Sequence, residues 1–436
     1  MKKNIYLNII LVFLCLYTFL IGIKGLSSAI NQISSPDDIN IGDQAQLKYI
    51  LVDGEKVKKA WVEVKSVPDE NGDFDYLFKQ KDIETDKVIK IIGVGNNSQV
   101  KKVASEWFLK ATHGKTFKSA FICLFIGIFA TVVFQSSSTT TSLIVAMAGG
   151  VIISPTSAVF MVMGANIGTT VTNTLISMGH ITKGEEFKRA FSAATVHDFF
   201  NLLAVLIFFP LEMIFGLFEK MSTGLATLFF SGDFDVEFQS PIKAAVKWGV
   251  GHFKDLVHVI SDNDWILLAA SGILTLLMLF SIVKLLKNMV LEKVEAFFDK
   301  YIFKTALRAM AFGVVLTILV QSSSITTSTI VPLAGAGVLT LRQIFPFTLG
   351  ANIGTTITAL LAAMVLNPTA MIVAFSHLLF NIFGIITIYP IKILRRIPMN
   401  AANKLSELAV RNKFIPILYL LVVFVLIPLF IILIGG

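Results

Sequence analysis

Two polar segments in a mostly apolar chain carry the residue types best suited to binding a small ion. The first is Gln135-Ser-Ser-Ser-Thr-Thr-Thr-Ser142 and the second is Gln321-Ser-Ser-Ser-Ile-Thr-Thr-Ser328. Consecutive polar residues within lipid are costly unless they pair or line a cavity. At a hairpin tip, the hydroxyls and the free N–H groups of the following arm form an anion site. Two such tips are expected to surround one small tetrahedral oxyanion. The candidate anion ligands are Gln135, Ser136, Ser137, Ser138, Gln321, Ser322, Ser323 and Ser324.

Neither polar segment contains Lys or Arg, so the charge of a divalent anion must be balanced from elsewhere. Bound cations are the simplest source, because Ser, Thr, Asn and Gln oxygens are hard ligands suited to Na⁺. The alternative is that these small and hydroxyl residues only pack helices together. Their occurrence in two duplicated blocks favours a binding site over packing alone.

A second duplicated block, Gly164-Ala-Asn-Ile-Gly-Thr-Thr-Val-Thr172 and Gly350-Ala-Asn-Ile-Gly-Thr-Thr-Ile-Thr358, supports the same interpretation. Two glycines flanking an Asn predict a broken helix whose free carbonyls can bind a cation. Close packing of helices through Gly is expected to explain part of the glycine usage. The candidate sodium ligands are Thr139, Asn166, Thr169, Thr170, Thr195, Asp198, Asn352, Thr355, Thr356 and Thr358.

Asp198 is the sharpest single candidate, because it lies in the apolar stretch Phe191–Pro210 and an acid inside a membrane span is functional by default. The alternative places it near the membrane surface, where it bonds a helix end. His197 and His377 fit helix packing at least as well as a role as ligands.

These motifs recur at a constant spacing, which predicts two copies of one unit. The polar segments and the Gly-Ala-Asn blocks are both separated by 186 positions (321 − 135 and 350 − 164). A third match pairs His197 with His377 at a spacing of 180, and it gives Asp198 the counterpart Leu378. The first unit is therefore expected to bear the extra cation.

The composition predicts a membrane protein that contains these units. The 436 residues are 55% hydrophobic and 15% charged, whereas soluble domains carry about 25% charge. The net charge of +8 does not indicate nucleic acid, because many basic residues flank apolar spans. The two cysteines lie in apolar segments and do not form a disulfide framework. Neither a metal-ligand cluster nor a nucleophile–base spacing predicts an enzyme, and no cofactor or obligate protein partner is expected.

The predicted fold is an all-α polytopic membrane protein with two inverted-topology repeats, re-entrant hairpins and a small soluble β-containing insert. Strand-like patterns at 46–52 and 60–65 indicate the insert. The predicted hairpin arms lie at 117–134, 139–153 and 325–338, and the first apolar stretch is expected to be an uncleaved span. The predicted parts are 1–30 (first span), 31–106 (extracytoplasmic insert), 107–217 (first repeat core), 218–262 (extracytoplasmic loop), 263–395 (second repeat), and 396–436 (cytoplasmic loop and final span).

Loop charge predicts the inversion of the second repeat. Loop 218–262 has four Lys and six acids, whereas the corresponding segment 392–413 has six Lys/Arg and one Glu. By the positive-inside rule the two segments lie on opposite sides of the membrane. A consistent path then places the N-terminus in the cytoplasm and the insert outside. The two hairpins enter from opposite faces, as in many secondary transporters.

Together the duplicated motifs, Ala193-Ala-Thr-Val-His-Asp-Phe-Phe-Asn201, Leu26-Ser-Ser-Ala29 and the closing span 409–434 resemble the type II sodium–phosphate cotransporter family. The resemblance covers most of the chain except 31–100. It implies a plasma-membrane importer of inorganic phosphate, driven by Na⁺ through alternating access. It also associates an acid at Asp198 with a sodium site that makes transport electrogenic. The insert, and Ala351 where vertebrate members carry Ser, depart from the family pattern.

Other functions remain open at this point. Another oxyanion such as sulfate, or phosphate export, would fit the same residues. An ion channel is less favoured, because the chain has a central Asp and lacks a filter-like carbonyl run.

Overall fold

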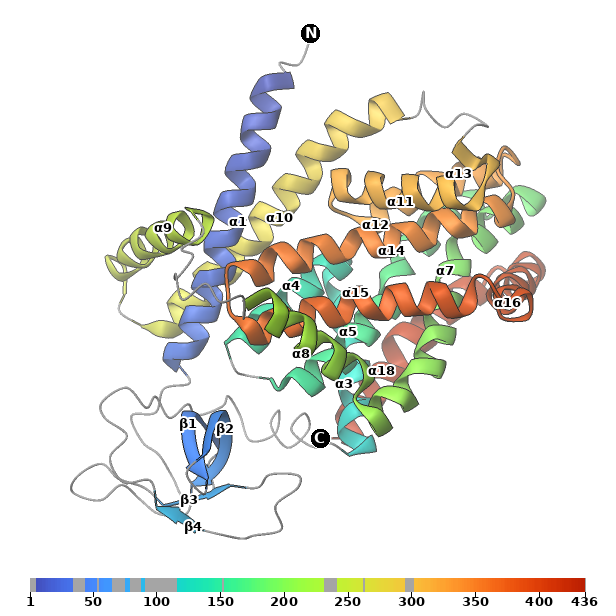
Figure 1. Cartoon of the computed structure of the whole chain (residues 1–436). Coiled ribbons are helices and arrows are strands. Elements are labelled where there is room, and N and C mark those ends of the chain that lie inside the picture. Colours follow the sequence, from blue (N-terminus) through green and yellow to red (C-terminus); the bar gives the residue numbers. More distant parts are fainter. Residues whose placement is uncertain are drawn as a thin grey trace.

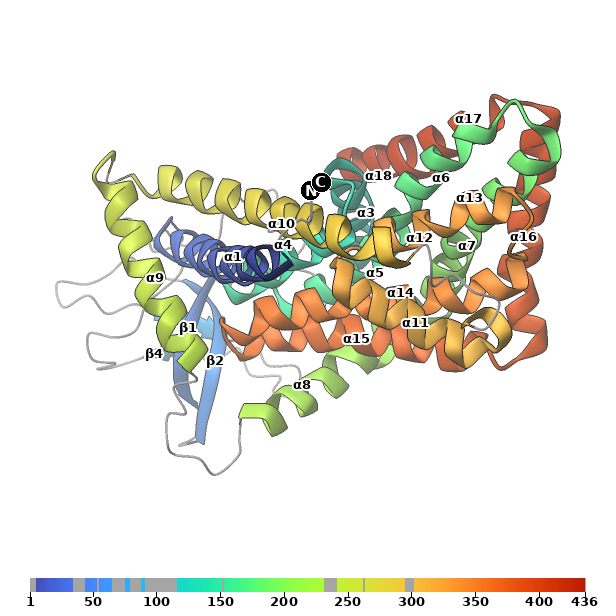
Figure 2. The ribbon, with the colours of Figure 1, turned by 90° about the horizontal axis from the view of Figure 1, so that it is seen from above.

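The computed structural model describes residues 5–33, 44–52, 55–64, 75–78, 88–90, 116–150, 153–230, 241–261, 263–294 and 302–435. Over these described residues the fold is α-helical apart from one sheet, which lies at the opposite end of the molecule from α16 (Figures 1 and 2). All its strand pairs are antiparallel, in the order β1-β2-β3-β4. The strands span Gln44–Val52, Glu55–Val64, Asp75–Phe78 and Val88–Lys90. They fall within the segment predicted to be a β-containing insert.

The described residues include eight helical spans long and apolar enough to cross a membrane, so the protein is an all-α polytopic membrane protein. The helices outside the two hairpins are α1 (Ile5–Ile33), α5 (Pro155–Ile167), α6 (Val171–Ser177), α7 (Gly184–Phe215), α8 (Leu217–Phe230), α9 (Pro241–His258), α10 (Asp264–Val294), α14 (Leu341–Met364), α15 (Pro368–Ile388), α16 (Lys392–Arg411), α17 (Ile415–Leu421) and α18 (Ile427–Gly435). Short helical turns η1 (Gly168–Thr170), η2 (Met178–His180), η4 (Ile302–Lys304) and η5 (Val422–Leu426) complete the set.

Two helical hairpins form around the polar segments. In the first, α3 (Phe117–Phe134) is followed by α4 (Ser137–Gly149). In the second, α11 (Ala306–Val320) is followed by α12 (Ser323–Ser328) and α13 (Ile330–Gly335). The tips at Gln135-Ser136 and Gln321-Ser322 are therefore where the polar sequence motifs predicted them.

The first arm of each hairpin crosses a neighbouring helix at matching glycines. A Cβ added to Gly164 of α5 would lie 1.9 Å from the carbonyl oxygen of Leu124 in α3. A Cβ on Gly350 of α14 would lie 1.9 Å from the carbonyl oxygen of Met310 in α11. The two glycines are 186 positions apart (350 − 164), and so are the two residues that they contact (310 − 124). The expected packing role of these glycines is confirmed, since only Gly permits such an approach.

The helix break predicted at both Gly-Ala-Asn blocks occurs in one of them. In the first block α5 ends at Ile167, and a 3₁₀ turn, η1, leads into α6. In the second block α14 runs through Gly350 and Thr356 as one helix, so the prediction of a second break is wrong. A single Gly costs a helix only about 1 kcal/mol, which tight packing against α11 offsets.

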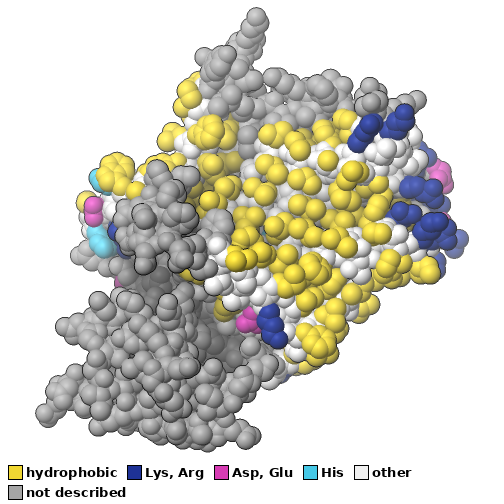
Figure 3. Space-filling model, viewed as in Figure 1, with side chains coloured by type: hydrophobic (Ala, Val, Ile, Leu, Met, Phe, Trp, Pro, Cys, Tyr) yellow, Lys and Arg dark blue, Asp and Glu magenta, His cyan; other side chains and the backbone are white. Residues whose placement is uncertain are grey.

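Two segments predicted as loops contain helices. The segment 218–262 holds most of α8 and all of α9, and the basic segment 392–413 forms α16. Helix α16 packs along α7. Exposed Lys and Arg side chains gather at this end of the molecule, while hydrophobic side chains cover much of the middle of the visible face (Figure 3).

The first span forms its own pair beside the hairpins. Helices α1 and α10 lie against one another when the molecule is seen from above (Figure 2). A Cβ on Gly22 would lie 2.6 Å from the Thr275 hydroxyl, and one on Gly25 would lie 2.8 Å from the Ser271 hydroxyl. Small residues on both helices therefore allow this close packing, as is common between membrane helices.

Candidate functional site

The two hairpin tips share an unusual backbone conformation. Gln135 and Gln321 have φ angles of 53° and 56°, and they are the non-glycine residues with positive φ in the described part of the chain. Each side-chain amide donates to a carbonyl three residues earlier, Gln135 to Val132 (2.6 Å) and Gln321 to Ile318 (2.7 Å). A bulky residue in this region of φ is strained and persists only where the surroundings hold it, as at functional sites.

A threonine from a neighbouring helix holds each of these Gln side chains. The Thr172 hydroxyl donates to Gln135 Oε1 (3.1 Å), and the Thr358 hydroxyl donates to Gln321 Oε1 (2.8 Å). The role of Thr358 as a sodium ligand stays a prediction. In the structure, its hydroxyl orients the Gln321 side chain at the tip. Thr172 was missed among the candidate residues, although the spacing of 186 pairs it with Thr358.

The first serine of each tip caps the arm that follows. Ser136 Oγ accepts from the Thr139 N–H (3.2 Å), and Ser322 Oγ accepts from the Ile325 N–H (3.3 Å). The first-turn N–H groups of an α-helix have no acceptor within the helix. The remaining serines of both tips, Ser137, Ser138, Ser323 and Ser324, are buried.

Two hydrogen bonds join the second hairpin to the broken helix of the first repeat. Ser324 Oγ donates to the Thr169 carbonyl oxygen (3.1 Å). Asn173 Nδ2 donates to Thr327 Oγ1 (2.7 Å). The structure therefore brings the second polar tip against the first Gly-Ala-Asn block, as a single shared site requires. Asn173 was not among the predicted residues.

Three of the predicted sodium ligands carry buried oxygens without a hydrogen-bond partner: Thr139 Oγ1, Thr170 Oγ1 and Asp198 Oδ1. Buried polar atoms are normally satisfied, and an ion is one common reason for an exception. Hydroxyl and carboxylate oxygens are hard donors that fit Na⁺. Other predicted hydroxyls donate to carbonyls three or four residues earlier: Thr169 to Ala165 (3.1 Å), Thr195 to Phe191 (2.9 Å), Thr355 to Ala351 (3.0 Å) and Thr356 to Ile353 (2.7 Å).

Asp198 is fully enclosed and has one protein partner in the described structure. The Tyr419 hydroxyl of α17 donates to Asp198 Oδ2 (3.0 Å). Asp198 is only 3% exposed, which excludes a place on the molecular surface. Tyr419 was missed from the sequence, because an isolated Tyr in the last apolar span gives no signal of its contacts.

A buried amide network connects the two Gly-Ala-Asn blocks. Asn352 Nδ2 donates to Asn201 Oδ1 (2.8 Å), and Asn201 Nδ2 donates to the Asn166 carbonyl oxygen (2.7 Å). The ring of His197 is hydrogen-bonded to Asn352 Oδ1. His197 of α7 thus forms a hydrogen bond to α14. The packing alternative for this residue did not specify a partner.

The corresponding residues of the second repeat are not joined in this way. Both ring nitrogens of His377 and Asn381 Oδ1 are buried without a hydrogen-bond partner. Asn381 Nδ2 turns back to the His377 carbonyl oxygen (2.9 Å), and Asn166 Nδ2 donates to the Val162 carbonyl oxygen (2.9 Å). The hydrogen-bond network is therefore formed around His197, whereas the matching bonds around His377 are absent among the described residues.

The site contains little fixed positive charge. Among the described residues, no Lys or Arg is fully buried, and no group of three or more His, Cys, Asp or Glu side chains could hold a metal ion. The chemistry offered is that of hydroxyl, amide and carbonyl dipoles around one carboxylate. Oxygen donors of this kind suit small hard ions.

The polytopic helical fold and its two polar hairpins define the class of this chain, an all-α polytopic membrane protein. The family model described as Na⁺/Pi-cotransporter matches residues 92–233 and 259–395, and the chain belongs to this family.

Curated relatives agree with this family. The chain is 32% identical over 381 residues to sodium-dependent phosphate transport protein 2A of Oryctolagus cuniculus, covering 70% of this chain and 59% of that protein. It is 30% identical over 419 residues to sodium-dependent phosphate transport protein 2B of Homo sapiens, covering 75% of this chain and 60% of that protein. The chain thus spans about three fifths of these relatives' length. No solved structure matches it.

Proposed function

We propose that this protein imports inorganic phosphate together with Na⁺ across the plasma membrane. The observation that carries the proposal is the pair of Gln-Ser-Ser-Ser tips, each held by a Gln–Thr hydrogen bond, with Ser324 of one tip bonded to Thr169 of the opposite repeat. Membership of the Na⁺/Pi-cotransporter family supports this substrate and this coupling ion.

Phosphate is proposed to bind between the tips. The serine hydroxyls and the free N–H groups of the first turn of α4 can donate to phosphate oxygens. The proposed ligands are those predicted from the sequence, from Gln135 to Ser138 and from Gln321 to Ser324. Since no buried Lys or Arg is found in the described residues, the negative charge of phosphate requires bound cations.

Na⁺ is proposed to bind beside the tips, where Thr139, Thr170 and Asp198 present oxygens without partners. The other predicted hydroxyl and amide residues of the Gly-Ala-Asn blocks complete the proposed sodium ligands. Na⁺ ions that only neutralise the phosphate charge give a transport step without net charge movement. One further ion at the Asp198 carboxylate would make the cycle electrogenic.

Transport is proposed to proceed by alternating access between two states. The network of His197, Asn201 and Asn352 is formed, whereas the matching His377 and Asn381 lack equivalent partners. This asymmetry supports inverted repeats that exchange their contacts.

The proposed orientation places the basic end of the molecule, formed by α16 and the first turns of α11 and α14, in the cytoplasm. The N-terminus would then lie inside and the insert outside. The insert's strands at the opposite end from α16 support this orientation (Figure 1).

Uptake of radiolabelled phosphate into liposomes that contain the purified protein tests this function. An inward Na⁺ gradient should drive saturable phosphate uptake, and an equal Li⁺ or K⁺ gradient should not. Excess sulfate should leave the uptake unchanged. Uptake that ignores Na⁺, or that sulfate abolishes, would overturn the proposal.

A further inference from the structure

The far ends of the two hairpin arms are held by side chains from the opposite repeat. Gly149 is the last residue of α4, and Gly335 is the last residue of α13. Asn367 Nδ2 donates to the Gly149 carbonyl oxygen (2.6 Å). The Arg189 guanidinium donates twice to the Gly335 carbonyl oxygen, from Nε (2.9 Å) and Nη2 (2.7 Å). Terminal carbonyls of a helix have no partner within it, so these bonds satisfy them.

The two contacts occupy matching places in the duplicated fold. Gly149 and Gly335 differ by 186 positions, the spacing of the tips themselves. A Cβ added at Gly149 would lie 3.4 Å from Ala370 Cβ, and one at Gly335 would lie 3.5 Å from Ala190 Cβ. Ala190 and Ala370 differ by 180, the spacing of the histidines. The same helix end therefore meets the same element of the opposite repeat in both halves.

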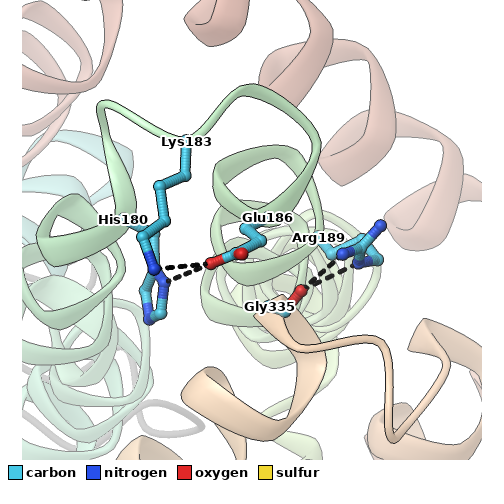
Figure 4. Close-up of polar contacts among 5 residues, drawn as sticks. All are labelled: His180, Lys183, Glu186, Arg189 and Gly335. Carbon is cyan, nitrogen blue, oxygen red and sulfur yellow. Dashed lines mark hydrogen bonds and ion pairs between the residues drawn. The ribbon is translucent and has the colours of Figure 1, made fainter.

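Arg189 lies against the end of the second hairpin, at Gly335 and Gly337. It projects from α7 toward Gly335, while Glu186 on the same helix faces His180 and Lys183 (Figure 4). The Glu186 carboxylate lies 3.2 Å from the Lys183 ammonium. A Cβ at Gly337 would lie 3.6 Å from Arg189 Nε, and the φ of +77° at Gly337 turns the chain there.

Holding an arm at its last carbonyl also positions its tip. Helix α4 has 13 residues, so its capped end at Ser136 lies about 20 Å from Gly149 at a rise of about 1.5 Å per residue. A short helix moves as a rod, so freedom at one end becomes displacement at the other. In the second hairpin, Ser322 to Ser324 lie at the start of α12. This helix continues through Thr329, which has helical φ and ψ, into α13, and Arg189 holds the last carbonyl of α13.

We infer that Arg189 and Asn367 are a matched pair of positioning residues, each fixing the binding tip of the opposite repeat through the end of its arm. This inference rests on the proposed transport function for its effect on phosphate. The two contacts are unequal, because Arg189 makes two charge-assisted hydrogen bonds and Asn367 makes one neutral bond. The second hairpin is therefore the more firmly held.

Uptake kinetics test the role of Arg189. Arg189→Gln should raise the KM for phosphate by about fivefold or more at saturating Na⁺, given that bonds from charged groups are the stronger kind. Arg189→Lys, which keeps the charge, should recover much of the affinity. The matched control is Arg342→Gln, at an exposed basic residue of α14, which should leave KM within twofold of the unchanged protein. If Arg189→Gln leaves the KM for phosphate unaltered and lowers only the amount of folded protein, the inference is overturned.

Amide hydrogen exchange tests the same inference without transport. Arg189→Gln should speed exchange in residues 322–328 and leave residues 136–142 unchanged. Asn367→Ser should do the reverse, because Ser can keep the cap on Ala370 N–H that Asn367 provides but cannot reach Gly149. An equal change of the exchange rate in both hairpins, or no change in either hairpin, would contradict the pairing. Absence of Na⁺-driven uptake by the unchanged protein would instead count against the proposed function, and the exchange pattern would still decide the positioning role.

Discussion

At the scale of single residues, Asp198 differs most from its surroundings. It is a buried carboxylate with one oxygen bonded to Tyr419 and the other without a partner. Its counterpart in the second repeat is Leu378, so the duplicated fold supplies this charge once. A buried charge needs a compensating partner, and Na⁺ is the one that the proposed cycle provides.

Asp198→Asn tests that role, because Asn preserves the shape and can still accept from Tyr419. We expect uptake to persist with at least about tenfold weaker Na⁺ affinity, the equivalent of about 1.4 kcal/mol. The charge moved per phosphate should fall. Both are measured by electrical recording and isotope uptake on the same liposomes.

Tyr419→Phe is the control, since it keeps the carboxylate and should retain the charge movement. An unchanged charge-to-phosphate ratio in Asp198→Asn would show that Asp198 does not hold the extra ion.

At the scale of helices, glycines set how closely the hairpins and their neighbours approach. Gly164→Ala and Gly350→Ala each place a Cβ 1.9 Å from a backbone carbonyl oxygen, a contact that only a shift of whole helices can relieve. We expect each change to cost about 1–3 kcal/mol or more, as overpacking does. The melting temperature of the purified protein, followed by its intrinsic fluorescence, should fall in both variants.

Gly224→Ala in α8 serves as the comparison, because an added Cβ there meets no atom within 4 Å. It should leave the melting temperature unchanged or raise it slightly. Equal melting temperatures in all three variants would refute the close crossing.

The sequence predicted more of the hairpins than of the contacts between them. The positions of the polar tips could be predicted, because a Ser cap and a run of hydroxyl residues are local features of the sequence. The continuous α14 was missed, since the same Gly-Ala-Asn-Ile-Gly-Thr-Thr letters break one helix and leave the other intact. Tyr419 and Asn173 were missed as well, because their partners, Asp198 and Thr327, lie far along the chain.

At the scale of the whole molecule, the unequal halves of the histidine network support the proposed two-state cycle. His197 is paired across the repeats with Asn352, whereas neither ring nitrogen of His377 has a partner. Removing the two rings should therefore have opposite effects. His197→Ala should disfavour the state seen here, and His377→Ala should favour it.

Spin labels at exposed Val338 and Leu408 report this change through their distance distribution, in protein lacking the two native cysteines. The ratio of the two populations should shift by about twofold to twelvefold, the equivalent of one hydrogen bond of about 0.5–1.5 kcal/mol. Shifts in the same direction for both variants would argue against exchange between the repeats.

Both tips are proposed to form one phosphate site that requires Na⁺. Equilibrium binding of radiolabelled phosphate to the purified protein, with and without Na⁺, measures this directly. We predict one phosphate per chain in Na⁺ and little binding in choline. Gln135→Ala and Gln321→Ala should each weaken binding by about tenfold or more, the equivalent of a lost hydrogen bond and a displaced tip. Phosphate binding that persists without Na⁺, or that depends on only one tip, would contradict the claim.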